Sequence, residues 1–430
     1  MKRKVKNFFQ ISLITAVSLS LCACSNSASR KQSVNRSSLT NSIAPETIEG
    51  KEPDEDFITA TADFSIELFK QEALDEISDG NNVLVSPESV LTALAMTANG
   101  ANGTTRSDME QVICGGMAIQ DFNPYMYTYN NQLTQSEDVS FHLANSIWIK
   151  DNPEEIQVKE EFLQTDKTYF DAEAFLADFD ETTIQDINHW VDANTDGMID
   201  SLLNEIPDGV VMYLINALAF EGQWETPYEE QQIDEDGIFT NSSGTEETVA
   251  MLNSTEYQYI SSTNATGFIK NYEGNDYAFL ALLPNEDIAM DDYVASMTGN
   301  EFIELFQNRE YRDVIVKLPE FTYDYSTELS EPLSEMGMES AFSISADFSN
   351  MAETDTGALY ISRVLHKTYI QVDRSGTKAA AVTAVEMNKE TAMIEPETPP
   401  VVNLDRPFVY AIIDTHTGIP IFIGTVNTIE

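Results

Sequence analysis

Residues 82–105 read NVLVSPESVLTALAMTANGANGTT. Within this stretch, the apolar residues of 87–99 recur three and four positions apart, at Val90, Leu91, Leu94 and Ala95. This spacing places them on one face of an α-helix. Residues 58–78 show the same spacing. The sequence therefore predicts two helices, one before and one within this stretch.

Strand-like runs dominate the later part of the chain. β-Branched and aromatic residues bounded by turn residues occur at 210–220, 277–283, 313–318, 369–372, 408–413 and 420–426. From residue 57 onward we find no linker and no internal repeat that would divide the chain. The sequence predicts one α+β domain over residues 57–430, with helices early and strands late, although the length alone would admit two or three domains.

The composition is strongly acidic. The 430 residues include 72 Asp and Glu against 23 Lys and Arg, which gives a formal net charge of −49, and 42% of residues are apolar. Such apolar content is sufficient for a folded core. The negative charge argues against a nucleic-acid partner and against activation by a polyanion, since both need clustered cations.

The first residues resemble an export signal. Four cations at positions 2, 3, 4 and 6 precede an apolar run over 8–23, which is too short for a membrane span. The run ends LCAC at 21–24, similar to a bacterial lipobox in which Cys24 is lipidated. The alternative is an ordinary signal peptide cut near Ala23.

Cleavage before Cys24 would remove residues 1–23 and take the net charge from −49 to −53, because four cations and no acids are lost. Residues 24–56, rich in Ser and Asn and then in acid, are predicted to be a flexible tether. We expect an extracytoplasmic protein, lipid-anchored to the membrane or secreted. Cys114 then has no thiol partner and is predicted to be buried.

The usual motifs of hydrolytic, metal and phosphate chemistry are absent from the sequence, so we expect no enzyme, metal or cofactor. One metal-like motif needs weighing. Residues 192–200 (DANTDGMID) resemble the start of a calcium loop, but its twelfth position is Leu203 instead of the bidentate acid that closes the shell. A helix C-terminus at 194–197 explains these residues better.

Several blocks, in order along the chain, resemble those of the serpin family. Besides 82–105 they are 143–148 (LANSIW), 187–191 (INHWV), 195–199 (TDGMI), 216–224 (NALAFEGQW), 318–321 (LPEF), 333–348, 366–367 (HK), 406–408 (RPF) and 417–418 (TG). The resemblance covers about residues 57–430. It implies a monomeric serpin fold of three β-sheets and eight or nine helices, with an exposed reactive-centre loop.

The resemblance also assigns residues to the sheet that receives this loop. Ser86, Ser89, Asn216 and His366 match a hydrogen-bonded cluster, the shutter, that must rearrange when the sheet opens. Trp224 matches the residue at the upper opening of the sheet. These could equally be ordinary satisfied core residues.

The predicted loop, residues about 376–400, begins GTKAAAVTAVEM. Small or apolar residues recur with period two at Thr377, Ala379, Ala381, Thr383, Val385 and Met387. An exposed loop gives no packing reason for this alternation, whereas a strand that inserts into a sheet does. Gly376 is expected to supply the bend where insertion begins. The alternative is a helix, because the stretch is rich in Ala.

The implied mechanism is suicide inhibition. A serine protease cuts the loop, and insertion of the freed strand traps the acyl-enzyme before water can release it. Gly376, Thr377, Ala379, Ala381 and Thr383 match the inhibitory hinge. Arg374 and Lys378 depart from it, because the family usually places acids there; both are expected to point outward.

The scissile bond is open. Counting forward from Gly376 gives Glu390–Thr391, which we favour, with Ala392 and Met393 as alternatives, while counting back from Pro407 reaches Pro396. Glu390 suits a glutamyl-specific protease; the following residues suit elastase-like or subtilisin-like enzymes. Two other functions compete with inhibition: a non-inhibitory serpin that binds or chaperones a partner, and a solute-binding lipoprotein, whose two βαβ lobes this chain lacks.

Overall fold

The computed structural model describes residues 38–136, 138–152, 156–354, 358–377 and 398–429. Nine α-helices lie in these ranges: α1 Glu55–Asp79, α2 Pro87–Gly100, α3 Gly103–Ile113, α4 Ile119–Thr134, α5 Glu160–Phe170, α6 Glu181–Asn194, α7 Met290–Ser296, α8 Gly299–Gln307 and α9 Ser330–Leu333. The two helices expected at 58–78 and 87–99 are confirmed as α1 and α2.

The strands form three sheets. They are β1 Val83–Val85, β2 Val139–Lys150, β3 Ile156–Val158, β4 Glu173–Ala177, β5 Met212–Gln223, β6 Ile233–Thr240, β7 Glu246–Ser261, β8 Ala265–Asn271, β9 Tyr277–Pro284, β10 Glu310–Pro319, β11 Phe321–Glu328, β12 Ala352–Thr354, β13 Arg363–Val372, β14 Gly376–Thr377, β15 Val401–Asn403, β16 Phe408–Asp414 and β17 Pro420–Val426. The α+β class and all six predicted strands are confirmed. The expected order is only partly right, since β2 and β4 come early and α7 to α9 come late.

The stretch 82–105 folds from local signals. Val83–Val85 pairs with β17, and Ser86 then caps α2 by accepting a hydrogen bond from the Ser89 N–H. Pro87 follows at the first helical position, where a missing N–H is harmless. The helix so begun is buried along almost its whole length.

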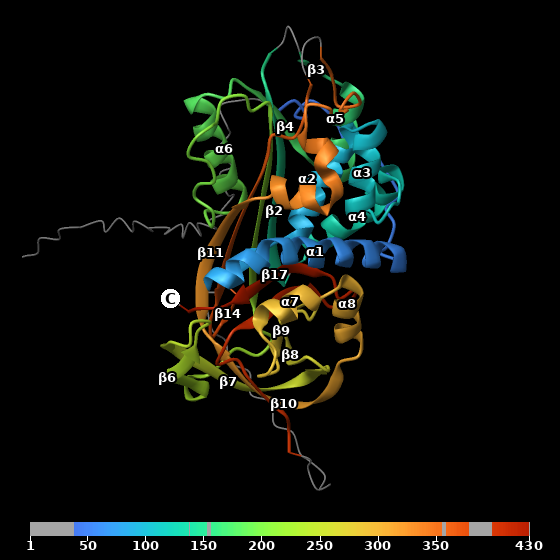
Figure 1. Cartoon of the computed structure of the whole chain (residues 1–430). Coiled ribbons are helices and arrows are strands. Elements are labelled where there is room, and N and C mark those ends of the chain that lie inside the picture. Colours follow the sequence, from blue (N-terminus) through green and yellow to red (C-terminus); the bar gives the residue numbers. More distant parts are fainter. Residues whose placement is uncertain (1–37, 137, 153–155, 355–357, 378–397, 430) are drawn as a thin grey trace, which may run out of the picture. The chain divides into compact units, whose positions relative to one another are not determined.

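One sheet has six strands in the order β11-β13-β14-β5-β2-β4. Its two faces bury different clusters, because successive side chains of a strand point to opposite sides. Tyr213 and Ile215 of β5 pack with Trp190 of α6, whereas Met212 and Leu214 belong to the main core. Figure 1 shows the result: α6 lies on one side of this sheet and α2 to α5 lie on the other.

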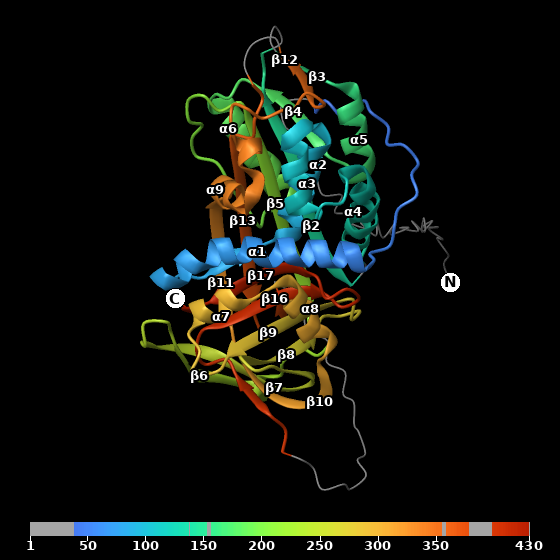
Figure 2. The same cartoon turned by 45° about the vertical axis from the view of Figure 1, so that its right-hand side comes forward.

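A nine-stranded sheet contains β1-β17-β16-β9-β8-β7-β10-β15, with β6 paired to β7. The C-terminal hairpin β16–β17 lies in its interior, and nearly every residue there is fully buried. Figure 2 shows α1 between the α2–α4 group and the pair α7 and α8. The third sheet pairs β12 with β3.

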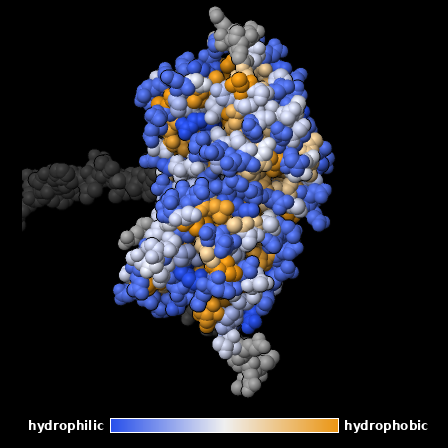
Figure 3. Space-filling view, in the orientation of Figure 1, coloured by the Kyte–Doolittle hydropathy of each residue, from blue (hydrophilic) through white to orange (hydrophobic). Residues whose placement is uncertain are grey.

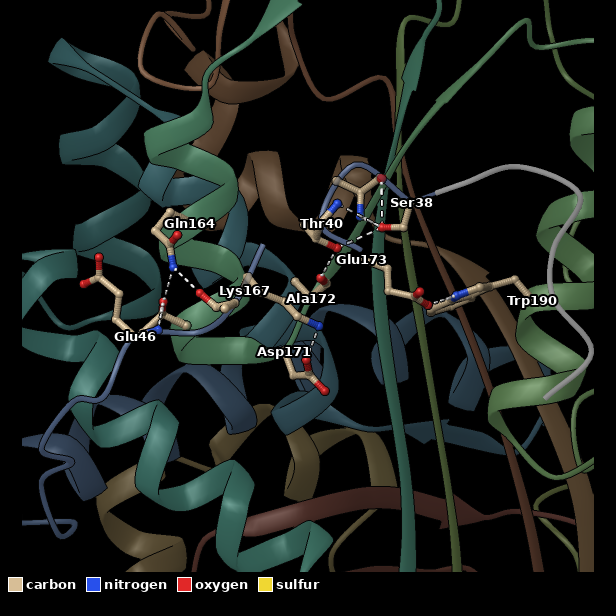
Figure 4. A network of polar contacts seen from close by, with 12 residues as sticks. Ser38, Thr40, Glu46, Gln164, Lys167, Asp171, Ala172, Glu173 and Trp190 are labelled. Carbon is tan, nitrogen blue, oxygen red and sulfur yellow. Dashed lines mark hydrogen bonds and ion pairs between the residues drawn. The ribbon is translucent and has the colours of Figure 1, made fainter. Parts of the chain in front are cut away.

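The segment that precedes α1 is attached to the domain. Thr40 Oγ1 donates to the Ala172 carbonyl at 2.9 Å, and the Leu39 N–H donates to the Ala174 carbonyl at 2.7 Å, so the segment runs along the edge of β4 (Figure 4). Farther along, the Glu46 N–H donates to Thr168 of α5 at 3.1 Å. Residues 38–54 therefore belong to the folded unit, and the boundary expected at 56 lies earlier.

The expected helix C-terminus at 194–197 and the expected burial of Cys114 are confirmed. Helix α6 ends at Asn194, and the chain turns through Gly197, whose φ is 76° and whose N–H donates to the Asp192 carbonyl at 2.9 Å. Within the ranges that the structure covers, no group of three or more His, Cys, Asp or Glu is placed to hold a metal ion. Cys114 is a free thiol that is 1% exposed, and burial raises its pKa.

The face of the molecule in Figure 3 is mainly hydrophilic, with apolar residues in separate patches. Among the helices of the described ranges, none combines the length and apolar character needed to cross a bilayer.

Candidate functional site

The chain reverses direction directly after β13. The Asp373 carboxylate accepts hydrogen bonds from the N–H groups of Ser375 at 2.7 Å and Gly376 at 3.2 Å. The Asp373 N–H in turn donates to the Gly376 carbonyl at 2.9 Å. Aspartate stabilises turns in this way because its short side chain reaches the backbone two residues on. The bend is therefore made by residues 373–375, and its assignment to Gly376 was wrong.

Gly376 instead permits a close approach between strands. It pairs with Gln223, and a Cβ at this position would lie 2.1 Å from the Gly222 carbonyl oxygen. No other residue fits there without moving β5. Together with Thr377 it forms β14, a two-residue strand that lies between β13 and β5.

Farther from the turn at 373–375 than β14, the two flanking strands pair directly with each other. Residues 363–367 of β13 run parallel to 213–217 of β5. Thr377 pairs with both Val372 and Gly222, which differ by 150 in number, as do the directly paired Arg363 and Tyr213. β5 and β13 thus keep the same relative register beside β14 and in the region where they pair directly. The first two residues of the predicted loop, Gly376 and Thr377, therefore already lie between β5 and β13, at the end of this strand pair that is next to the turn at 373–375.

Trp224 directly follows β5, at the end of the β5–β13 pair where β14 lies. Its ring Nε1–H donates to the Asp373 carbonyl at 2.9 Å, and its backbone N–H donates to the Ser375 carbonyl at 3.0 Å. Its ring stacks on Tyr272 with centroids 4.7 Å apart. The Trp224 side chain therefore holds the turn that leads into the loop.

A second aromatic residue reaches the loop itself. The Tyr272 hydroxyl lies 2.6 Å from Thr377 Oγ1, and the two residues are 0% and 2% exposed. Tyr272 comes from the connection between β8 and β9 in the nine-stranded sheet. This contact joins the two large sheets through the hinge.

Arg374, one of the two cations at unexpected positions, has acidic partners. Its guanidinium contacts Glu320 at 3.0 Å and Glu235 at 3.4 Å, and its N–H donates to the Glu320 carboxylate at 3.0 Å. The side chain is 39% exposed, as expected for an outward position. The reversed charge is thus matched by an acid just before β11. The pair is partly solvated, so its contribution to stability is small.

The predicted shutter residues come together in part. The Ser86 N–H donates to His366 Nε2 at 3.0 Å, and Ser86 Oγ donates to the Ile421 carbonyl at 3.0 Å. Ser89 follows one turn into α2, and Asn216 lies opposite His366 in the β5–β13 pair. Burial lowers the pKa of His366 to about 3, so the imidazole is neutral and its Nε2 accepts.

Several predicted residues lie outside the described ranges. These are Cys24, Lys378, Ala379, Ala381, Thr383, Glu390, Thr391, Ala392 and Met393. Conversely, the sequence reasoning assigned no role to Tyr272, Asp373 or Glu320. Asp373 had a local signal, since Asp before Ser-Gly is typical of a turn.

Comparison with known proteins agrees with this geometry. The model of the serpin (serine protease inhibitor) family matches residues 59–429. Iripin-8 of Ixodes ricinus is 30% identical over 82% of this chain and 89% of its own length. Alpha-1-antiproteinase of Rattus norvegicus is 27% identical over 85% of this chain and 87% of its own length.

Among solved structures, the thermophilic serpin tengpin in its native state is 45% identical, with a TM-score of 0.85, over 91% of this chain and 99% of that one. Tengpin in its latent state gives a TM-score of 0.76. The matched family is in general one of serine protease inhibitors, and its members are not enzymes. From its ordered sequence blocks, its three sheets with nine described helices and a family match over residues 59–429, we conclude that this chain belongs to the serpin family.

Proposed function

We propose that this serpin is a suicide inhibitor of serine proteases. The observation that carries the proposal is the position of β14. Gly376 and Thr377 already form the start of a strand between β5 and β13. The relative register of β5 and β13 is the same beside these two residues as in the region where the two strands pair directly. Further residues can follow without a slip of either flanking strand.

In the cleaved chain, we expect the residues after Thr377 to pair with β5 and β13 in the register that β14 already has. Ala379 would then lie opposite Phe220 and Ile370, and Val385 opposite Leu214 and Val364, all of which belong to the main core. Directly opposite residues share a face of the sheet. The alternating small residues of the loop would therefore point into that core.

Two of the three charged residues within 378–389, Lys378 and Glu386, fit the same register on the other face. Lys378 would lie opposite Glu221 of β5, and Glu386 would lie opposite Arg363 of β13. Opposite charges across a strand pair are favourable. The positive charge at Lys378, unusual for the family, would thus be complemented within the sheet.

The chemistry is that of an interrupted hydrolysis. The protease serine Oγ attacks the carbonyl carbon of Glu390, the bond to Thr391 breaks, and the new amine leaves with a proton from the protease. An ester then links the protease to Glu390. Insertion of residues 378–389 displaces the protease before water attacks this ester. Ala392 and Met393 remain the alternative positions, and glutamyl-specific, elastase-like and subtilisin-like enzymes are the candidate partners.

The direct test is to mix the chain with a glutamyl endopeptidase, pancreatic elastase and subtilisin, each in turn. We expect a protease adduct that survives boiling in detergent, at about one inhibitor per protease, because an ester is covalent. N-terminal sequencing of the released C-terminal fragment identifies the bond.

The same samples separate inhibition from a non-inhibitory binding role. Chain nicked in the loop by a catalytic amount of protease should melt at a much higher temperature than intact chain, because the inserted strand adds pairs on both sides. Clean cleavage by all three proteases, with full protease activity and no rise in melting temperature, would favour the non-inhibitory function.

We further propose that the chain is held outside the cytoplasmic membrane by lipid on Cys24. The supporting observations are the cationic start, the short apolar run and the LCAC sequence at 21–24. Replacing Cys24 with Ser should move the protein from the detergent phase of a cell extract to the aqueous phase or the medium. An unchanged distribution would instead support an ordinary signal peptide.

A further inference from the structure

Tyr272 and Thr377 satisfy each other in a buried position. The two hydroxyl oxygens are 2.6 Å apart, with exposures of 0% and 2%. In the part of the chain that the structure covers, neither hydroxyl has another hydrogen bond. If Thr377 left the sheet, the Tyr272 hydroxyl would remain buried without its partner, which is unfavourable.

Tyr272 is held in place independently of the loop. Its ring stacks on Trp224 and meets Phe220 edge to face with centroids 4.9 Å apart. Its N–H donates to the Tyr277 carbonyl at 3.0 Å. Gly222 provides room for the ring, since a Cβ there would lie 3.0 Å from Tyr272 Cδ1. The hydroxyl is therefore positioned before Thr377 arrives.

The strand that this contact supports is weak without it. β14 has only two residues, and its backbone makes few ladder pairs, one between Thr377 and Val372 and two with β5. Strands this short have little stability of their own. A buried side-chain hydrogen bond from the other sheet is thus a large part of what keeps the hinge inserted.

We propose that Tyr272 is a positioning residue that holds the hinge in the sheet of the uncut chain, so that insertion after cleavage starts from a formed nucleus. The effect on insertion after cleavage rests on the proposed inhibitory function. The claim that Tyr272 holds the hinge in the sheet concerns only the intact chain. A hinge already seated shortens the time between acylation and trapping. The Tyr272 hydroxyl therefore influences how many cleavage events end in inhibition.

The test uses the full chain with Tyr272→Phe, which keeps the stacked ring, Thr377→Val, which keeps the shape of the hinge residue, and the double variant. Tyr293→Phe, which alters another buried tyrosine in α7, is the matched control. Amide hydrogen exchange at residues 376 and 377 is measured in intact chain. The number of inhibitors consumed per trapped protease is measured with pancreatic elastase and subtilisin.

We expect exchange at 376 and 377, and the inhibitor consumed per protease, each to rise about fivefold in Tyr272→Phe, the factor that one hydrogen bond of ordinary net strength contributes. The double variant should rise no more than either single variant, because it leaves no buried hydroxyl without a partner, and Tyr293→Phe should match the parent. Parental exchange in Tyr272→Phe, or additive effects in the double variant, would overturn the proposal. Failure of the parent to trap any protease would contradict inhibition alone, because the exchange measurement still decides the role of Tyr272.

Discussion

Replacing Thr377 with Arg should remove most of the boiling-resistant protease adduct while leaving the loop cleavable. Thr377 is 2% exposed, and its hydroxyl lies against that of Tyr272. An arginine there would place an unpaired charge between two sheets, which is strongly unfavourable. The hinge would leave the sheet, insertion would lose its starting point, and water would release the acyl-enzyme first.

The expected magnitude is large. The inhibitor consumed per trapped protease should rise by about tenfold or more, since burial of an unpaired charge has a cost of several kcal/mol. The measurement is titration of protease activity combined with a denaturing gel.

Thr322→Arg provides the matched control. Thr322 lies on β11 of the same sheet but is exposed, so an arginine there stays in water. This variant should trap protease like the parent. If Thr377→Arg also traps protease at the parental ratio, then entry of residue 377 into the sheet is not required for inhibition.

The sequence was most informative where the decisive contacts are local. Helices α1 and α2 follow from apolar spacing and caps that lie within a few residues of each other. The alternation at 377–387 likewise needs only the period of a strand. The period shows that a strand is expected, but not that its first two residues are already inserted in the uncut chain.

The contacts that hold the hinge are distant in sequence, and the sequence alone could not reveal them. Tyr272 and Thr377 are separated by 105 positions; Thr377 belongs to the six-stranded sheet, and Tyr272 to the β8–β9 connection of the nine-stranded sheet. Arg374 finds its partner Glu320 at a separation of 54. The attachment of residues 38–54 could not be predicted from their composition either, because it depends on distant partners: Ala174 and Ala172 for residues 39 and 40, and Thr168 of α5 for Glu46.

A buried acid close to the shutter leads to the second large effect. Glu88 lies in the first turn of α2, is 0% exposed, and its Oε1 accepts from Thr92 at 3.2 Å. In the described ranges its Oε2 has no hydrogen-bond partner. Burial raises the pKa of Glu88 from 4.5 to about 8.

The sign of the pH dependence follows from proton counting. Between pH 4.5 and about 8, the folded chain holds a proton on Glu88 that the unfolded chain has lost. The free energy of unfolding therefore falls as pH rises through this window. His366 acts in the opposite direction at lower pH. Its folded pKa is about 3 against 6.5 unfolded, so acid below pH 6.5 favours the unfolded chain.

Replacing Glu88 with Gln should remove the loss of stability at higher pH. The amide resembles the protonated acid in shape and keeps an oxygen for Thr92, so variant and parent should be similarly stable near pH 4.5. Above that pH the variant should gain on the parent by up to about 1.4 kcal/mol per pH unit until pH 8.

Urea unfolding of intact chain at pH 4.5, 6, 7 and 8 measures this difference. Glu160→Gln, at an exposed glutamate in the first turn of α5, is the matched control and should follow the parent at every pH. A constant offset between Glu88→Gln and the parent from pH 4.5 to 8 would mean that Glu88 is ionised throughout, stabilised by the N-terminus of α2 despite its burial.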